Sequence, residues 1–453
     1  MGLILLKNQK IIVIGGNAAG PAAAAKAKRV NPDAEVLMIE AGKFISTGTC
    51  ELPYVLSGDV KDYRNIVFFD PETFYEKKKV KVLVRHRVER IDRMNRVIEV
   101  RNLEDDSVCE FEYDKLVITT GATANKIPDI PDDTVNHFHY KTVADYLAVK
   151  DYMDKNPVKK VLVFGAGYIG IETAEAFREL KKDVRIVEHE GLPMPSSEPE
   201  VQSLVKDVLD KHGVDFYGNA GSTKFIFTGN RITAVNISGR IVECDLVVTS
   251  IGFKPNVQLA VSAGLKTGKL GGIITDSRLC TNDASIYAAG DCIEVTEFVT
   301  NRNSLIPLAT LAHEQGHIAG ANAAGAYQIF AKPVKNAAVK IFENTLATVG
   351  ITSAEAREHG IVYDEVHEVA SDIASVMPGS SRVFGKIIYN KFNRRILGAE
   401  FFGGGEVTGF ANLISGAILM NETMEFLTRI NYNYTPPKSP LINILSLLGK
   451  KAT

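Results

Sequence analysis

Two stretches of the sequence follow one pattern, in which a short apolar run ends in a glycine-rich turn and a helix-forming segment begins. The apolar runs cover residues 10–14 and 161–164, and the two turns lie 150 residues apart. The turn glycines are Gly15, Gly16 and Gly20 in the first copy, and Gly165, Gly167 and Gly170 in the second. A strand, a tight turn and a helix in this order form a βα unit. The repeat therefore predicts an α/β fold that contains two parallel sheets.

A carboxylate follows each turn, at the end of the next apolar run. Glu40 directly follows the apolar run at residues 36–39, twenty positions after Gly20, and Glu188 directly follows the run at residues 184–187. In sheets that bind dinucleotides, a carboxylate in this place accepts a hydrogen bond from the adenosine ribose, and the glycine turn brings backbone N–H groups to the pyrophosphate. Two such units in one chain indicate two dinucleotides. FAD and a nicotinamide dinucleotide are the usual pair, because one delivers hydride and the other holds or splits the electron pair.

Further turn residues belong to the predicted cofactor contacts. They are Ala18 and Ala19 in the first turn, and Tyr168 and Ile169 in the second. The first turn departs from the dinucleotide pattern at Asn17, where the middle glycine is expected. Taken alone, this turn is equally compatible with an ordinary βα connection. The second copy shows no departure, so the two together favour dinucleotide binding.

Later positions extend the predicted flavin site. Residues 117–122 and 247–256 are interpreted as strands that end in glycine turns, at Gly121 and Gly252, and we expect them to mark domain crossings. Asp291 follows another strand-like run and is expected to bind a ribityl hydroxyl of the flavin. Its alternative role is to cap the next helix, because aspartate is a preferred N-cap residue.

Two segments are interpreted as structural. Residues 80–100 alternate apolar and charged side chains, with turn-forming residues at 92–95, which predicts a hairpin whose charges face solvent. Residues 308–325 form a predicted helix that carries His313 and His317 four positions apart. Because no third ligand is placed nearby, a packed or solvated helix face is favoured over a metal site.

Composition limits the partners and the compartment. The chain has 453 residues, which corresponds to about three domains. Its net charge of −2 gives no basic excess that would favour a nucleic acid. The cysteines stand at positions 50, 109, 244, 280 and 292, and their small number and irregular spacing favour a reducing compartment such as the cytoplasm. Residues 1–6 are apolar but too few for a signal sequence or a membrane span.

Cys50 is the candidate reactive residue. It lies in the segment FISTGTCELPY, residues 44–54, just before a helix start predicted at Pro53, which is suited to a first helical turn. Cys50 is therefore expected near unbonded backbone N–H groups and the positive end of a helix dipole. Such a setting lowers the pKa of a thiol from about 8.5 and produces the thiolate that attacks disulfides, persulfides and peroxides. The alternative is a buried structural cysteine.

The chain contains the motifs GGNAAG, FISTGTCELPY, TTGA, GAGYIG, IGFKPN, IYAAGDC and YTPP. Through these motifs it resembles the pyridine nucleotide-disulfide oxidoreductases along essentially its whole length. The resemblance is to the single-cysteine branch, which contains coenzyme A disulfide reductases, persulfide or polysulfide reductases, NADH oxidases and NADH peroxidases. The two-cysteine branch is excluded because Val55 stands where it needs a second cysteine.

The resemblance implies two Rossmann-like dinucleotide-binding domains, for FAD and NAD, and a C-terminal α+β dimerisation domain that forms a homodimer. It divides the chain into an FAD domain at residues 1–120 and 244–325, an NAD domain at 121–243, and an interface domain at 326–453. Many oxidases and peroxidases of this branch carry a histidine where this chain has Ala18, which weakens a peroxide-handling role. The YTPP segment resembles the YAPP segment of coenzyme A disulfide reductases, which implies that Tyr434 approaches the partner subunit's cysteine as a general acid. Simple dimer packing is the alternative.

The predicted activity is FAD-dependent reduction of a small disulfide or persulfide through Cys50. The resemblance alone favours coenzyme A disulfide, coenzyme A persulfide and polysulfide as substrates, in that order. NADH is expected over NADPH, because Glu188 would repel a 2′-phosphate. Glu51 replaces the glycine usual after this cysteine, and its carboxylate can raise the thiol pKa or discourage the binding of anionic coenzyme A.

The alternatives are an NADH oxidase that cycles through cysteine sulfenic acid, and a flavoprotein that carries electrons to a protein partner. Candidate coenzyme A contacts, each also explained as an ordinary surface or packing residue, are Lys26, Arg29, Tyr63, Arg64 and Arg302.

Overall fold

The computed structural model describes residues 8–452, so the apolar run at residues 1–6 lies outside the described residues. The described chain folds into two units. The first consists of residues 8–125, 253–297 and 302–333, and the second of residues 126–252, 298–301 and 334–452. Within the described residues, no helix combines the length and the apolar character needed to cross a bilayer.

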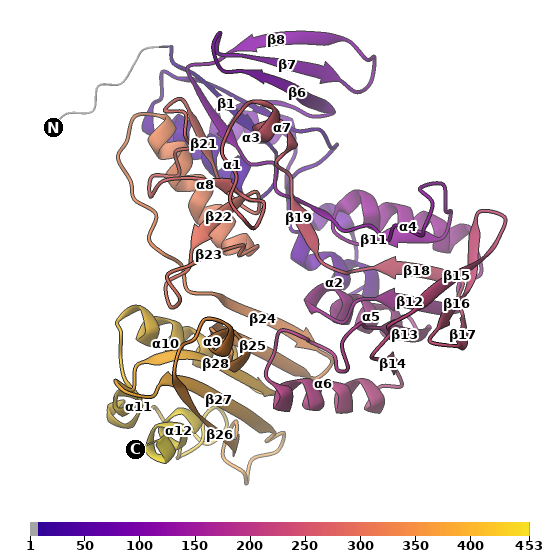
Figure 1. Cartoon of the computed structure of the whole chain (residues 1–453), viewed down its shortest axis with the longest axis vertical. Helices are drawn as coiled ribbons and strands as arrows, with labels where there is room; N and C mark the ends of the chain where they lie inside the picture. The colour runs from indigo at the N-terminus through magenta and orange to yellow at the C-terminus, as the bar shows by residue number, and fades with distance from the viewer. Residues whose placement is uncertain (1–7, 453) are drawn as a thin grey trace. The chain divides into compact units, whose positions relative to one another are not determined.

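The first unit is built on a five-stranded parallel sheet with the strand order β21-β9-β1-β2-β5. The strands are β1 (Lys10–Ile14), β2 (Glu35–Ile39), β5 (Lys81–Leu83), β9 (Lys115–Ile118) and β21 (Ile286–Ala288). Their β-branched and aliphatic side chains are largely buried, as expected for a sheet covered on both faces. Helices α1 (Ala19–Val30) and α8 (Ala309–Ala323), far apart in sequence, pack side by side through small residues (Figure 1).

Shorter elements complete the first unit. Strands β3 (Ile45–Thr47) and β4 (Val67–Phe69) pair with each other, and β20 (Ile273–Ile274), β22 (Ile293–Thr296) and β23 (Asn303–Ser304) form a small sheet. The remaining helices are α2 (Leu52–Ser57), α3 (Pro71–Lys78) and α7 (Gln258–Ser262).

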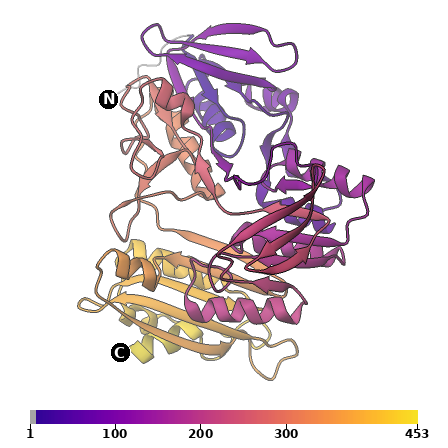
Figure 2. The same ribbon diagram turned by 45° about the vertical axis from the view of Figure 1, so that its right-hand side comes forward.

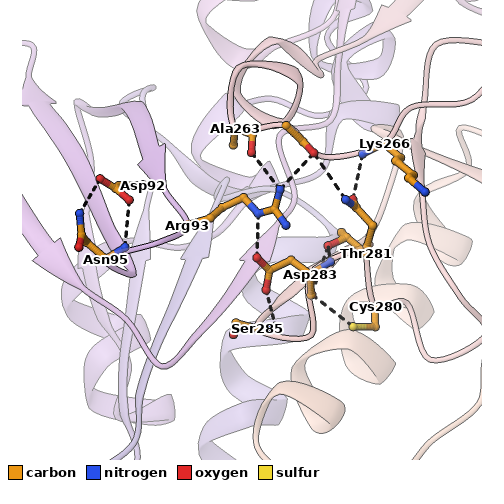
Figure 3. A network of polar contacts seen from close by, with 11 residues as sticks. Asp92, Arg93, Asn95, Ala263, Lys266, Cys280, Thr281, Asp283 and Ser285 are labelled. Atoms are coloured by element: carbon orange, nitrogen blue, oxygen red, sulfur yellow. Dashed lines mark hydrogen bonds and ion pairs between the residues drawn. The ribbon is translucent and has the colours of Figure 1, made fainter.

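The predicted hairpin is part of a three-stranded antiparallel sheet. Its strands are β6 (His86–Asp92), β7 (Val97–Asn102) and β8 (Val108–Glu112). The expectation that its charges face solvent is wrong for Arg93, in the turn after β6. The Arg93 Nε donates to Asp283 at 2.7 Å and its Nη1 donates to the carbonyl of Gly264 at 3.1 Å (Figure 3). Arg93 thus ties the hairpin to residues that arrive much later in the chain.

Two strands lie where the chain passes between the units. β10 (Ala122–Ala124) follows Gly121, β19 (Phe253–Pro255) follows Gly252, and the two strands pair antiparallel. Both glycines have positive φ, 65° and 83°, which matches the glycine turns expected there. Thr120 and Asn256 join the two crossings, with the Thr120 hydroxyl donating to the Asn256 carbonyl at 2.6 Å.

The second unit contains another five-stranded parallel sheet, with the strand order β11-β18-β12-β13-β14. The strands are β11 (His137–His139), β12 (Lys160–Phe164), β13 (Asp183–Val187), β14 (Asp215–Tyr217) and β18 (Leu246–Thr249). Helices α4 (Val143–Lys155), α5 (Tyr168–Glu179) and α6 (Pro199–Lys211) connect them, and β15 (Thr223–Thr228), β16 (Arg231–Ile237) and β17 (Arg240–Glu243) form an antiparallel sheet. Because β18 pairs with β12, residues 246–249 belong to this sheet, whereas the sequence-based division assigned them to the 244–325 segment.

The C-terminal part of the second unit is a five-stranded antiparallel sheet with the order β24-β25-β28-β27-β26. The strands are β24 (Asn336–Ile341), β25 (Asn344–Gly350), β26 (Tyr363–Ser371), β27 (Arg382–Asn390) and β28 (Ile396–Gly403). Its helices are α9 (Ser353–Glu358), α10 (Thr408–Leu419), α11 (Met424–Arg429) and α12 (Ile444–Ala452). Helix α6 lies against this sheet in both views (Figures 1 and 2). The predicted fold class, two Rossmann-like parallel sheets and a C-terminal α+β domain, is confirmed.

Candidate functional site

The first glycine turn joins β1 to α1 and closes tightly on itself. Gly15 has a φ of 111°, and a Cβ on Gly20 would lie 1.9 Å from the Gly15 carbonyl oxygen. Ala18, the residue before α1, has a φ of 35°, which is a strained value for alanine. Ala19 is the first residue of the helix. The turn therefore presents backbone rather than side chains at the N-terminus of α1.

Glu40 stabilises this turn. Its Oε2 accepts the N–H of Gly16 at 2.7 Å, and its Oε1 accepts the N–H of Gly42 at 2.6 Å. Each carboxylate oxygen has a second lone pair, so the group can still accept a ribose hydroxyl.

The second turn repeats this arrangement between β12 and α5. Glu188, which is 9% exposed, accepts the N–H of Ala166 at 2.7 Å and the N–H of Glu190 at 3.2 Å. Gly165 has a φ of 96°, and a Cβ on Gly170 would lie 2.0 Å from the Gly165 oxygen. The two turns thus share one geometry, in which the carboxylate holds the residue after the first glycine.

Other residues of the second turn face different surroundings. Gly167 precedes α5 with a φ of −81°, and a Cβ there would meet nothing within 4 Å. Ile169 is 37% exposed. The Tyr168 hydroxyl forms a hydrogen bond of 3.0 Å with the hydroxyl of Thr348, on β25. Burial raises the pKa of Tyr168 to about 12.

Asn17, the departure in the first turn, connects the turn to the segment that carries Cys50. Its Oδ1 accepts the backbone N–H of Thr47 at 2.9 Å and the Thr47 hydroxyl at 3.2 Å. The N–H of Ser46 donates to the Gly16 carbonyl at 2.8 Å. A glycine in place of Asn17 would lose two of these three hydrogen bonds, so the asparagine has a role of its own that the motif did not reveal.

Cys50 lies in the 3₁₀ turn Thr49–Glu51, directly before α2, and Pro53 is the second residue of that helix. The Cys50 side chain is exposed and forms no disulfide, which differs from the alternative of a buried structural cysteine. A Cβ on Gly48 would lie 2.4 Å from Glu51 Oε2, so the Glu51 carboxylate folds back over Gly48.

The other cysteines provide a contrast. Burial raises the pKa of the Cys244 thiol to about 12 and that of Cys292 to about 11, so both stay protonated near neutral pH. Burial also raises the pKa of Cys280. Cys109 is exposed, but it lies on β8 in the antiparallel sheet.

Asp291 lies between β21 and β22, so the alternative role as a helix cap is wrong: the next element is a strand, and α8 begins only at Ala309. The adjacent N–H of Gly290 donates to the buried Gln315 side chain at 2.8 Å. Sequence reasoning missed Gln315, although a glutamine in a helix of small residues was the available signal.

Tyr434 belongs to the second unit and Cys50 to the first. Tyr434 is 49% exposed and precedes a turn in which the N–H of Ser439 donates to Thr435.

His313 and His317 have ring centroids 4.5 Å apart on α8. In residues 8–452 no group of three or more His, Cys, Asp or Glu side chains is arranged to hold a metal.

Both glycine turns fit a dinucleotide. In each, close backbone contacts leave no room for side chains at the first and last glycines, and a carboxylate is fixed at the end of the following strand. FAD is expected at Gly15–Gly20, Glu40 and Asp291, and the nicotinamide nucleotide at Gly165–Gly170 and Glu188. Two dinucleotide sites and an exposed cysteine define a flavin-dependent pyridine nucleotide oxidoreductase.

Comparison with known proteins agrees with this class. The family model "Pyridine nucleotide-disulphide oxidoreductase" matches residues 9–316, and the model of the dimerisation domain of the same family matches residues 336–440. The chain belongs to the pyridine nucleotide-disulphide oxidoreductase family.

Several relatives match over nearly the whole chain. An NADH oxidase of Methanocaldococcus jannaschii is 32% identical over 445 residues, which cover 98% of both chains. The structure of an NAD-dependent persulfide reductase from A. fulgidus matches with a TM-score of 0.94 and 32% identity, covering 98% of this chain and 83% of that one. The structure of reduced Bacillus anthracis CoADR-RHD matches with a TM-score of 0.94 and 29% identity, covering 99% and 80%.

Proposed function

We propose that this protein is an NADH-dependent, FAD-containing reductase of a small disulfide or persulfide, with Cys50 as the redox residue. The observation that carries the proposal is the exposed Cys50, whose segment is hydrogen-bonded to the first glycine turn through Asn17 and Thr47. When bound, the nicotinamide and the flavin supply the electron pair. The relatives named as a persulfide reductase and as CoADR-RHD support this choice.

Cys50 acts as the nucleophile of the reaction. Its thiolate attacks one sulfur of the substrate, the substrate S–S bond breaks, and the first product leaves and takes up a proton. The electron pair then cleaves the mixed disulfide, which restores the Cys50 thiolate and releases the second thiol. Each turnover consumes one NADH and one proton and yields two thiols from a disulfide, or a thiol and hydrogen sulfide from a persulfide.

Coenzyme A disulfide or persulfide is the favoured substrate, because two cationic side chains of α1, Lys26 and Arg29, lie near His317 of α8. The pKa of His317, on α8, is lowered by burial and by the nearby charges of His313, Lys26 and Arg29. Lys26 and Arg29 lie on α1. A cluster of this kind suits the phosphates of coenzyme A better than a small polysulfide.

Other candidate contacts are engaged elsewhere. Arg64 donates its Nε to Asp62 at 2.9 Å, so this charge is already paired. The Tyr63 ring packs edge-on against Phe44 with centroids 6.1 Å apart, which supports a packing role.

We also propose a homodimer with NADH as the preferred reductant. The residues matched by the dimerisation model support an isologous interface, in which Tyr434 approaches the partner's cysteine as a proton donor. The buried Glu188 carboxylate supports discrimination against a 2′-phosphate.

An NADH oxidase is the second candidate, favoured by the relative from Methanocaldococcus jannaschii. In that case FAD, when bound, would supply electrons for the reduction of oxygen, and the Cys50 thiolate would be oxidised to sulfenic acid by the resulting peroxide and then reduced again. Ala18 at the position of the family's histidine counts against peroxide handling. An electron carrier to a protein partner would not need Cys50 at all.

Replacement of the cysteine separates these activities. Cys50→Ser should abolish anaerobic NADH oxidation driven by coenzyme A disulfide, since a serine hydroxyl does not form a mixed disulfide. FAD content and reduction of the flavin by NADH should persist. Cys109→Ser, which changes the other exposed cysteine, is the matched control and should retain the full rate.

Two results would contradict the proposal. Cys50→Ser enzyme that reduces disulfides at the original rate would favour the electron carrier. Oxygen consumption that exceeds turnover with every disulfide, and that depends on Cys50, would favour the oxidase.

A further inference from the structure

A cluster of charges centred on the buried Lys386 joins the start of α6 to the five-stranded antiparallel sheet within the second unit. The Lys386 side chain, on β27, is 3% exposed and lies 2.9 Å from Glu198. It also lies 3.1 Å from Glu200 and 3.0 Å from Glu365. The Glu198 carboxylate, which is fully buried, accepts the Ser353 N–H at 2.6 Å and the Ser353 hydroxyl at 2.7 Å. Since breaking a buried ion pair leaves an uncompensated charge, the cluster holds residue 198 firmly on the sheet.

Glu400, on β28, is a second buried carboxyl beside this cluster. It is 2% exposed, and its Oε2 accepts the backbone N–H of Glu198 at 2.8 Å. Its Oε1 is buried with no hydrogen-bond partner in the part of the chain that the structure describes. Burial, followed by the nearby Glu198 carboxylate, raises the pKa of Glu400 to about 8, so the group is neutral at pH 7.

The residues before Glu198 form one side of the second glycine turn. Residues 189–198 start directly after Glu188 and run to α6. Within them, the N–H of the fully buried Met194 donates to the carbonyl of Ala166 at 2.8 Å. Glu198 is therefore the fixed end of a segment that also contacts the turn.

The opposite side of the turn is attached to the same place on the sheet. Tyr168 bonds to Thr348, and Thr348 faces Glu400 in the pairing of β25 with β28. Glu400 thus lies between the two attachments of the turn.

We propose that Glu198 and Glu400 are positioning residues for the nicotinamide nucleotide. Through residues 189–198 and Tyr168 they hold the turn at 165–170 in its binding geometry. Ionisation of Glu400 loosens this turn. The inference rests on the proposed assignment of this turn to NADH. The signal in the sequence was a single charged residue inside an apolar strand, at Lys386 in VFGKIIY and at Glu400 in LGAEFF.

The groups around Glu400 determine the direction of the effect. Glu198 and Ser197 face it from the residues before α6, Lys386 from β27, and Tyr168 from α5. Three carboxylates already lie against the single cation Lys386, so ionised Glu400 would add a further negative charge beside them. The added repulsion between Glu400 and Glu198 acts on the residue that anchors the turn.

The test compares NADH use across about pH 6 to about pH 10 in the holoenzyme. In the wild-type enzyme KM for NADH should rise at least about threefold from pH 7 to pH 9, while kcat changes less. Glu400→Gln, which mimics the neutral group, should abolish the rise of KM between pH 7 and pH 9. Glu198→Gln should raise KM about tenfold at pH 7 and show little further rise at pH 9, because it removes the charge that ionised Glu400 repels. Glu365→Gln is the matched control, since Glu365 contacts the same lysine but not the turn, and it should follow the wild type.

Calorimetric titration with NAD⁺ over the same pH range separates this inference from the proposed function. Wild-type enzyme that binds no NAD⁺ at any pH would overturn the assignment of the turn. Binding whose pH profile is the same in wild type and Glu400→Gln would overturn the inference alone, as would a Glu365→Gln effect equal to that of Glu198→Gln.

Discussion

Gly167 and Gly170 offer a test of which turn glycines serve the fold and which serve the nucleotide. A Cβ on Gly170 would lie 2.0 Å from the Gly165 oxygen, about 1.4 Å closer than an ordinary contact. The strand and helix on either side must separate to relieve this overlap. Gly170→Ala should therefore cost about 3 kcal/mol of folding free energy, the upper end of the range for overpacking.

Gly167→Ala should behave differently. Gly167 has an ordinary φ of −81°, and a Cβ there would meet nothing within 4 Å, so the fold does not require glycine. Alanine restricts the unfolded chain and should leave stability unchanged or raise it by up to about 1 kcal/mol. The new methyl group would instead occupy the space where the backbone approaches a pyrophosphate. KM for NADH should rise about tenfold, which corresponds to about 1.4 kcal/mol of binding free energy.

Thermal unfolding and NADH kinetics, measured on the same preparations, check both expectations. Gly221→Ala is the control, because a Cβ on Gly221 also meets nothing within 4 Å, and this residue is outside the turn. It should change neither KM nor flavin reduction. If Gly167→Ala kept the wild-type KM and unfolded at a lower temperature, the glycine would serve the fold, and the reasoning about the pyrophosphate would be refuted.

Three further predictions follow from single side chains. Wild-type enzyme should use NADH about tenfold more efficiently than NADPH, and Glu188→Ala combined with His189→Arg should narrow or reverse this ratio of kcat/KM. Mixed dimers of Cys50→Ser and Tyr434→Phe chains should keep the activity of one intact composite site, and complete loss would exclude sharing between subunits. The raised pKa of Glu400, about 8 against 4.5, means that this group is protonated when folded and ionised when unfolded between those values. Its contribution to the free energy of unfolding therefore falls by about 1.4 kcal/mol per pH unit as pH rises through that window. Unfolding curves should show that the difference in unfolding free energy between Glu400→Gln and wild type changes by this amount per pH unit.

Local sequence was sufficient to predict the two glycine turns and the strands beside them. Gly15, Gly20 and Glu40 lie within 26 consecutive residues, and the hydrogen bond from Gly16 to Glu40 spans only 24 positions. Backbone conformation and alternating burial depend on neighbouring residues, so the sequence pattern of such a βα unit is the same in different tertiary surroundings. The same holds for the helix predicted at residues 308–325, which is found as α8.

The partners of isolated charges were decided by tertiary structure. Arg93 belongs to an alternating pattern typical of a solvated hairpin, yet it meets Asp283, 190 positions away. Lys386 and Glu200 are separated by 186 positions, and only the packing of α6 on the antiparallel sheet brings them together. A charged residue in a strand predicts that a partner must neutralise it if it is buried, because desolvation of a charge is costly. It does not indicate which distant segment supplies the opposite charge. Composition and periodicity thus define the elements and their turns. The contacts of Glu198 and Glu400, in contrast, exist only after α6 and the parallel sheet have packed on the five-stranded antiparallel sheet of the second unit.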